Sequence, residues 1–240
     1  MTEDKPPSRQ LTLRDRLCFA WIAMQYAIRL DQLQRLLYRY TPEADRYKLR
    51  PDIDYVSLDR VYKWIKKHTA NGFIEKDIIL HRDQPWIWLT RAGLREVELN
   101  FNYSGAPASL RLPHLYYINQ VRLAIEVKRP GDVWKSERQI RKESPAAARG
   151  ENQPHTPDAI LTNAMNGKAT SIEVEVHAKT DNELEDDLRE LAVTCKSVWY
   201  FTTSATRRQV EKVLDTFEPV MQKPFTLYDL KDYGNEYGIS

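Results

Sequence analysis

The sequence predicts a mixed α and β protein in two parts, an α+β domain over residues 11–100 and an α/β domain over residues 114–240. Apolar residues recur at helical spacing in both parts. Short apolar runs bounded by turn residues indicate strands between these helices. Residues 101–113 contain Gly, Pro and Ser without periodicity, which predicts a linker. With 240 residues, the chain is long enough for each part to bury its own core.

The first part is predicted to begin with three helices after a polar, disordered arm at residues 1–10. Helical spacing of apolar residues places the first helix at about 12–28. Asp31 is placed to cap a short second helix. A polar loop follows, and Ser57 can cap a third helix that ends at Asn71.

The third helix is predicted to bury one face and expose a basic one. Leu58, Val61, Tyr62 and Ile65 form the predicted inward stripe. The residues predicted to face outward are polar, basic or aromatic: Arg60, Lys63, Trp64, Lys67 and Asn71.

A two-stranded hairpin is predicted directly after this helix. Residues 73–80 and 86–90 are apolar runs, and the polar turn between them carries Arg82. Thr90 can then cap a further helix that ends near Val97. The order helix, helix, helix, hairpin, helix is that of a winged helix-turn-helix domain.

The basic helix and the hairpin predict that this domain binds double-stranded DNA. The major groove admits one helix, and phosphates dominate the affinity, so a reading helix needs cationic and polar groups on its outer face. Residues 1–100 hold 18 Lys and Arg against 14 Asp and Glu, whereas residues 101–240 hold 18 against 20. A charged face on a solvated helix is the alternative explanation, and winged helices also serve as protein–protein modules.

The second part is predicted to alternate helices and strands. A helix over about 114–127 and a short helix over 134–143 precede a hairpin that turns at Asn166-Gly167. The strands of that hairpin are Ala159–Thr162 and Ser171–Val176. The elements that follow are a helix at about 182–195, a strand at 197–202, a helix at 206–217 and a strand at 225–228.

Three acidic residues are predicted to meet on the hairpin of the second part. Asp158 begins its first strand, and Glu173 and Glu175 point to the same face of its second strand. Such carboxylates would repel one another without a cation, and Mg²⁺ or Mn²⁺ prefers oxygen ligands of this kind. The alternative is an ordinary half-exposed strand, in which these charges alternate with Ile172 and Val174.

The order helix, Pro-Asp, hairpin, Glu-x-Glu strand, helix and strand resembles the PD-(D/E)xK nuclease fold. That fold usually carries Glu-x-Lys, and Glu175 takes the place of the lysine here, as in some restriction endonucleases of the superfamily. The resemblance implies that Asp158, Glu173 and Glu175 hold the metal, that Lys179 supplies the missing cation and orients or activates water, and that Glu137 is an auxiliary carboxylate.

The chain also resembles the replication-relaxation family of plasmid and mobile-element proteins over about residues 12–202. The resemblance implies a role in plasmid DNA replication and relaxation. The motifs that carry it are Trp134-x-x-Glu137-Arg138, His155-x-Pro157-Asp158-Ala159-Ile160-Leu161, Ile172-Glu173-Val174-Glu175 with Lys179, and Val198-Trp199-Tyr200-Phe201.

Composition favours a cytoplasmic protein that does not enter a membrane. The longest apolar stretch, Leu17–Ile28, falls short of the roughly 20 residues that span a bilayer. The N-terminus is polar and does not resemble a signal peptide. Cys18 and Cys195 are far apart in the sequence and predict reduced thiols rather than a disulfide framework.

Two functions from different classes follow from these observations. The first is a Mg²⁺- or Mn²⁺-dependent DNA endonuclease or nickase of a plasmid or mobile element. The second is a DNA-binding regulator or replication accessory protein whose nuclease-like domain does not cleave and serves as a homodimer interface.

Overall fold

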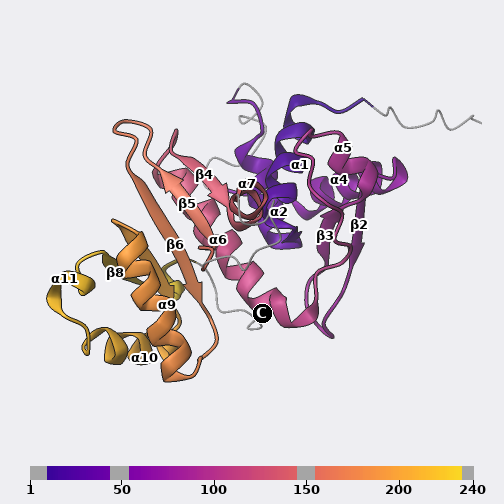
Figure 1. The fold of residues 1–240 in the computed structure, drawn as a ribbon. Coiled ribbons are helices and arrows are strands. Elements are labelled where there is room, and N and C mark those ends of the chain that lie inside the picture. The colour runs from indigo at the N-terminus through magenta and orange to yellow at the C-terminus, as the bar shows by residue number, and fades with distance from the viewer. Residues whose placement is uncertain (1–9, 44–53, 145–154, 234–240) are drawn as a thin grey trace, which may run out of the picture. The chain divides into compact units, whose positions relative to one another are not determined.

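The structure, a computed structural model, describes residues 10–43, 54–144 and 155–233. It divides into two compact units, Met1–Leu115 and Tyr116–Ser240. Figure 1 shows that each unit combines helices with a β-sheet. The predicted arm at 1–10 lies almost entirely outside the described residues, as do most of the polar loop before Ser57 and most of the loop after residue 144.

The described residues of the first unit include the helices α1 (Leu13–Gln25), α2 (Leu30–Arg39) and α4 (Leu58–Ala70). Thr12 caps α1 with a hydrogen bond from the backbone nitrogen of Asp15 at 3.1 Å. The N-cap of α2 is Arg29, so Asp31 lies in the first turn of that helix and not at its cap. A carboxylate at this place still interacts favourably with the helix dipole.

The first unit also contains an antiparallel sheet in the order β1-β3-β2. Its strands are β1 (Ala27–Arg29), β2 (Ile74–Asp77) and β3 (Trp86–Leu89). The hairpin β2–β3 is as predicted, but β1 replaces the predicted last turn of the first helix. The backbone of Ala27–Arg29 pairs with β3 instead, so a strand partner distant in sequence determines this segment.

The core of the first unit lies between the sheet and the helices. Phe19 and Ile22 of α1, Leu33 of α2 and Trp86 of β3 are fully buried. The short helix α5 (Arg91–Arg95) follows the sheet, with Thr90 as its N-cap. A Cβ atom at position 93 would overlap the backbone carbonyl oxygen of Phe73. Only glycine at this position therefore allows α5 to pack this closely against the start of the hairpin.

The second unit is built on a mixed five-stranded sheet in the order β4-β5-β6-β7-β8. The pairs β4–β5 and β5–β6 are antiparallel, whereas β6–β7 and β7–β8 are parallel. The strands are β4 (Val133–Ser136), β5 (Ala159–Thr162), β6 (Ala169–Glu175), β7 (Val198–Thr202) and β8 (Phe225–Asp229).

Helices connect these strands. Helix α6 precedes β4 and begins directly after a 3₁₀ turn at Ser109–Arg111. A second 3₁₀ turn, at Leu230–Tyr233, follows β8. Among the described residues, the helices of this part of the chain are α6 (Leu112–Lys128), α7 (Glu137–Glu143), α9 (Asp181–Thr194), α10 (Ser204–Leu214) and α11 (Pro219–Gln222).

The predicted helix over 134–143 is wrong in its first turn. Val133–Ser136 forms β4, which pairs with β5 from Val133↔Thr162 to Ser136↔Ala159. The helix begins only at Glu137, after Ser136 as its N-cap. As with β1, the pairing of four residues with a distant strand overrides a weak local preference.

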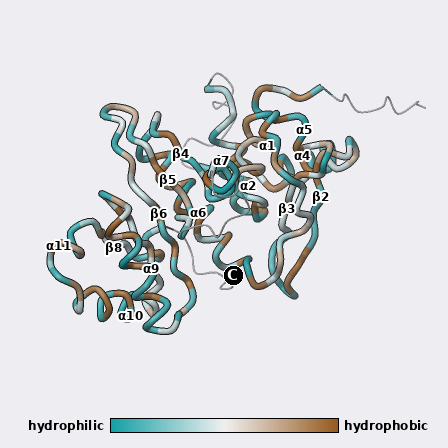
Figure 2. Tube along the Cα trace, viewed as in Figure 1, coloured by the Kyte–Doolittle hydropathy of each residue, from teal (hydrophilic) through white to brown (hydrophobic). Residues whose placement is uncertain are grey.

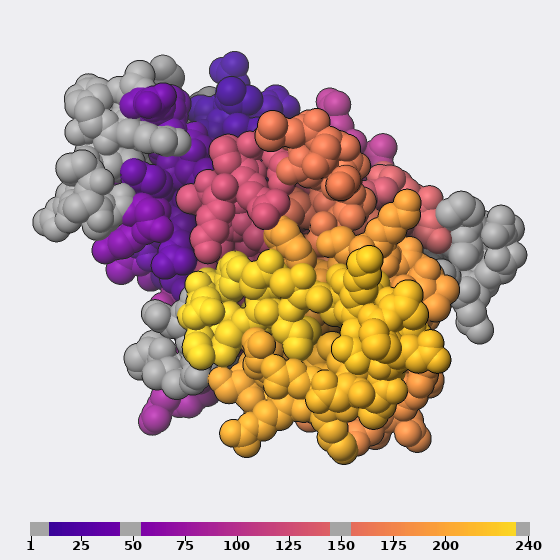
Figure 3. Space-filling model, turned by 90° about the vertical axis from the view of Figure 1, so that its left-hand side faces the viewer, coloured from indigo at the N-terminus to yellow at the C-terminus, as the bar shows by residue number. Residues whose placement is uncertain are grey.

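One face of the second sheet packs against α9 and α10. Leu188 of α9 and Val210 of α10 are fully buried in a cluster with Val198 and Tyr200 of β7. Figure 2 shows apolar and polar residues interspersed along α9 and α10, which is typical of helices that bury one side. In the space-filling view, the residues from α9 onward form a continuous surface, coloured orange to yellow (Figure 3).

No helix in the described part of the chain combines the length and apolar character needed to cross a membrane. Both cysteines are free thiols. Cys18 is fully buried, and burial raises the pKa of its thiol above the ordinary range. Cys195 is partly buried, with its Sγ 3.1 Å from the Oγ of Ser171.

Candidate functional site

Helix α4 presents a basic face. Val61 and Ile65 are buried, whereas Arg60, Lys63 and Lys66 are exposed at three-residue spacing. The Nζ of Lys63 lies 2.8 Å from Oδ2 of Asp59, and both side chains are largely in solvent, so the pair is worth little and is easily broken. Arg60, Lys63 and Lys66 are thus open to an anionic partner.

The structure corrects the predicted faces of this helix at three positions. Trp64 was expected on the outer face but is only 5% exposed, whereas Leu58 and Tyr62 were expected inside and are exposed. The indole Nε1 of Trp64 donates to Oδ1 of Asp15 on α1 at 2.8 Å. A buried hydrogen-bond acceptor thus holds Trp64 in the core, where it cannot stack on DNA.

Asp15 is the centre of this buried contact. Its Oδ2 accepts from the Nζ of Lys67 at 3.1 Å, and its Oδ1 lies 3.2 Å from Nε2 of His68. Burial by itself would raise the pKa of Asp15, but the close approach of His68 and the hydrogen bond from the backbone of Thr12 hold it well below its ordinary value. Lys67 is therefore half-buried and joins α4 to α1, in addition to its predicted place on the basic face.

A cavity of about 390 Å³ lies between the start of α1 and this part of α4. Its lining includes four cationic side chains, from Arg14, Arg60, Lys63 and Lys67, against the one carboxylate of Asp15. Positive charge is therefore in excess, which suits a phosphate group. Arg14 was not predicted as a site residue, because only the packing of α1 against α4 brings it there.

The other two predicted DNA contacts lie at the ends of β2–β3 and α4. Arg82 is exposed in the hairpin turn, in a left-handed conformation with φ of 64°. The adjacent Asp83 braces this turn, since it accepts from Nη1 of Arg29 at 3.3 Å and from Nε1 of Trp86 at 3.0 Å. Asn71 is the C-cap of α4 and is half-buried.

The predicted acidic cluster lies where β5 begins and β6 ends. Ala159 pairs with Ile172, so Asp158 comes level with the next residue of β6, Glu173. Oδ2 of Asp158 accepts from the backbone nitrogen of Val174 at 2.8 Å. This bond fixes the Asp158 carboxylate beside the C-terminal end of β6.

Two cations already contact the glutamates of this cluster. Nε2 of His155 lies 2.9 Å from Oε1 of Glu173. Nζ of Lys179 lies 2.7 Å from Oε2 of Glu175 and 2.9 Å from Oδ2 of Asp187 on α9. The same Oε2 of Glu175 accepts from the Oη of Tyr200 at 3.3 Å.

The pKa values of the cluster reflect burial and mutual repulsion. Burial, together with the charges of Glu137 and Glu175, raises the pKa of Asp158 to about 7. Burial and the charge of Asp158 likewise raise the pKa of Glu173 to about 7. Burial is the main cause of both shifts, and the acidic neighbours add to it.

The two cations of the cluster keep their protons. Its hydrogen bond with Glu173 raises the pKa of His155 to about 9, against the opposing effect of burial. Burial would lower the pKa of Lys179, but Glu175 and Asp187 raise it above its ordinary value. At neutral pH both His155 and Lys179 are therefore positively charged.

Glu137 lies beside the start of β5. Its backbone nitrogen donates to the carbonyl oxygen of Asp158 at 2.8 Å, and its Oε1 accepts from Nε of Arg141 at 2.8 Å. The negative charge of Glu137 contributes to the raised pKa of Asp158. It belongs to the outer part of the cluster.

The donors of this cluster suit a hard divalent cation such as Mg²⁺ or Mn²⁺. All are carboxylate oxygens, and the contacts of Glu173 and Glu175 with described residues each use one oxygen only. Among the described residues, no three His, Cys, Asp or Glu side chains form a group arranged to hold a metal ion. The cluster therefore matches a divalent cation in the chemistry of its oxygen ligands and in their closeness, and not in a ready coordination geometry.

Sequence reasoning missed Asp187 and Tyr200 as members of the cluster. Asp187 lies on the polar side of α9, and Tyr200 is a buried residue of β7 next to Glu173 in the sheet. The eight-residue spacing of Lys179 and Asp187 does not predict their contact, because it depends on how the chain turns into α9.

Comparison of the chain with models of known protein families, with curated proteins and with solved structures finds no match in any of the three.

Proposed function

We propose that this protein binds double-stranded DNA through a winged helix-turn-helix domain formed by its first unit. The order of helices and strands in that unit, with α4 directly before the hairpin β2–β3, supports the proposal. So does the basic face of α4, because a helix that enters the major groove needs cations to meet the phosphates on both sides. In this arrangement Arg82 contacts the DNA from the hairpin turn.

We propose further that the second unit is a PD-(D/E)xK nuclease-like domain and that the protein is a DNA endonuclease or nickase. The observation that carries this proposal is the placement of Asp158 level with Glu173 at the junction of β5 and β6, with Glu175 two residues further along β6 and Lys179 in contact with Glu175. The sequence of elements from α6 through β5, β6 and α9 to β7 has the order expected of that fold.

Asp158, Glu173 and Glu175 would hold Mg²⁺ or Mn²⁺ in this proposal. When bound, the ion would lower the pKa of a coordinated water and offset negative charge on the phosphodiester. Lys179 keeps its proton, so its role is to stabilise the charge of the phosphate rather than to accept a proton from water. His155 is positively charged at neutral pH and lies against Glu173, so it would offset negative charge at the site.

A plasmid assay tests the enzymatic proposal. Supercoiled plasmid is incubated with the protein and Mg²⁺ or Mn²⁺, beside the Asp158→Asn variant. We expect metal-dependent conversion to nicked or linear DNA that falls by at least about 100-fold in the variant, as is common when a charge-stabilising group is lost. Equal cleavage by both proteins would assign the activity to a contaminant or another site.

A DNA-binding protein that does not cleave is the second candidate. The contacts of Glu173 with His155 and of Glu175 with Lys179 favour it, because protein cations already balance these carboxylates. Such a protein would act as a regulator or replication accessory factor of a plasmid or mobile element, with the second unit as its homodimer interface. Retained duplex binding without any metal-dependent cleavage would select this candidate.

A further inference from the structure

A hollow of about 420 Å³ lies on the first unit, over α5 and the segment that follows it. Its lining combines two guanidinium groups, two aromatic rings and two side-chain amides around an apolar floor. The lining residues are Arg91, Leu94, Arg95, Asn100, Phe101, Asn102 and Tyr103. None of these residues belongs to α4, so the hollow is separate from the proposed duplex-binding face.

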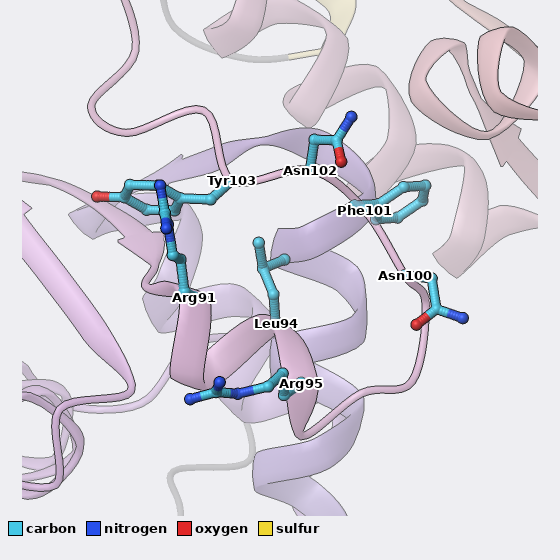
Figure 4. Close-up of a pocket in the computed structure, with 7 residues that line it drawn as sticks. All are labelled: Arg91, Leu94, Arg95, Asn100, Phe101, Asn102 and Tyr103. Carbon is cyan, nitrogen blue, oxygen red and sulfur yellow. The ribbon is translucent and has the colours of Figure 1, made fainter.

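The aromatic and cationic side chains that line the hollow surround Leu94. Figure 4 shows Tyr103 and Phe101 on either side of Leu94, with Arg91 next to Tyr103 and Arg95 across from the two rings. Phe101 and Tyr103 are two residues apart in the segment that follows α5, and both line the hollow. Arg91 and Arg95 are one helical turn apart on α5.

The ring of Tyr103 is held in place before any ligand arrives. Its Oη donates to Oε2 of Glu75 at 3.1 Å, and Nε1 of Trp88 donates to the same oxygen at 2.8 Å. The guanidinium of Arg91 lies 5.6 Å from the centre of the Tyr103 ring. A fixed ring loses little conformational entropy when a flat ligand stacks on it.

Arg95 supplies the positive charge of the hollow. Its side chain is exposed and forms no ion pair in the described part of the chain. A guanidinium in this state is suited to hold a phosphate with two hydrogen bonds. The hollow therefore offers a cation, aromatic faces and amide groups within the space of one nucleotide.

We propose that this hollow binds one unpaired nucleotide, with its base stacked on Phe101 or Tyr103 and its phosphate held by Arg95. Aromatic stacking beside a cationic side chain is how proteins hold single-stranded nucleic acid without sequence preference. Asn100 and Asn102 also line the hollow. The nucleotide is either free or part of a single DNA strand, and both share this chemistry.

Two labelled strands of equal charge test the stacking. Fluorescence anisotropy measures the binding of the full-length protein to a 12-nucleotide dT strand and to an abasic strand of the same length. We expect the dT strand to bind roughly 10-fold more tightly, which is the scale of one stacked base. In Phe101→Ala that preference shrinks or vanishes, and in Arg95→Ala both strands bind more weakly.

Four controls keep the result interpretable. Far-UV circular dichroism verifies that each variant is folded, and Phe101→Tyr, which keeps the ring, should retain the preference for dT. Arg60→Ala on α4 should weaken duplex binding but leave the ratio of dT to abasic affinity unchanged. Duplex binding should in turn be retained in Phe101→Ala, so failure of this proposal is distinguishable from failure of the proposed function.

A mononucleotide separates the two sources of the ligand. If dTMP binds with an affinity close to that of the strand and Arg95→Ala weakens it, the ligand is a free nucleotide. If dTMP binds far more weakly than the strand, the hollow takes one nucleotide of a strand. Equal affinity of wild type for the dT and abasic strands, with no binding of dTMP, would overturn the proposal.

Discussion

At the scale of single residues, the protein uses buried carboxylates in two opposite ways. Asp15 of the first unit is surrounded by donors and is ionised, and its pKa is well below the ordinary value. Asp158 of the second unit has acidic neighbours and a pKa raised to about 7. The first arrangement stabilises a fold, whereas the second is the kind of arrangement found at functional sites.

Replacement of Asp15 tests the structural role of the first arrangement. In Asp15→Ala, the Nε1 of Trp64 loses its buried acceptor and Lys67 loses its partner. We expect the free energy of unfolding, measured by urea denaturation, to fall by about 3 kcal/mol. The matched control is Asp59→Ala, which breaks the exposed pair with Lys63 and should cost less than about 1 kcal/mol. Equal losses in the two variants would contradict the assigned role.

Replacement of Asp158 tests whether ionisation of this buried carboxyl group destabilises the folded protein. The pKa of Asp158 is higher in the folded protein than in the unfolded chain, so the folded state binds this proton more tightly. Its contribution to stability is therefore present below about pH 4 and is lost as the pH rises to about 7. Asn cannot ionise, so in EDTA at pH 8 we expect Asp158→Asn to be more stable than wild type by roughly 1–3 kcal/mol.

Thermal unfolding across pH 4–8 measures this effect. The gain from Asp158→Asn should shrink towards zero at pH 4, where both proteins are neutral at this position. A variant less stable than wild type at every pH would show that the carboxylate serves the fold and is not strained.

At the scale of secondary structure elements, α4 joins the core to the proposed DNA interface. Val61, Trp64 and Ile65 point inward, so Arg60 and Lys63 are left outside. In Arg60→Ala/Lys63→Ala, we expect weaker binding of duplex DNA of any sequence. The slope of log K against log salt should fall in magnitude by about 2, one unit for each lost phosphate contact.

A cation of the second unit provides the control for this measurement. Lys168 is exposed in the turn between β5 and β6. Lys168→Ala changes the net charge without touching α4, so its salt slope should match that of wild type. A double variant on α4 that also keeps the wild-type slope would exclude α4 as the DNA-binding helix.

The elements also show how far local sequence signals reach. The hairpin β5–β6 was predictable, because Asn166-Gly167 marks its turn and apolar residues alternate along its strands. Both β1 and β4 were missed, because these segments of three and four residues become strands only by pairing with distant partners. Trp64 was misplaced for the same reason, since its buried partner Asp15 lies 49 positions away in the chain.

At the scale of the whole molecule, the predicted site is distributed over elements that only the fold brings together. The sequence spacing indicated that Glu173 and Glu175 share one face of a strand. It placed His155 near the cluster but did not indicate that His155 would contact Glu173 or that Asp187, on α9, would join them, because those contacts depend on how the loop and the helix pack on the sheet.

The central claim is that Asp158, Glu173 and Glu175 bind a divalent cation. Titration of Mn²⁺ into the full-length protein, followed by isothermal titration calorimetry at pH 8, measures this directly. We expect saturable binding in wild type that is at least about 10-fold weaker or absent in Asp158→Asn, as expected when a ligand is lost from a site of few carboxylates. Absence of binding in wild type, or equal binding in Asp158→Asn, would contradict it.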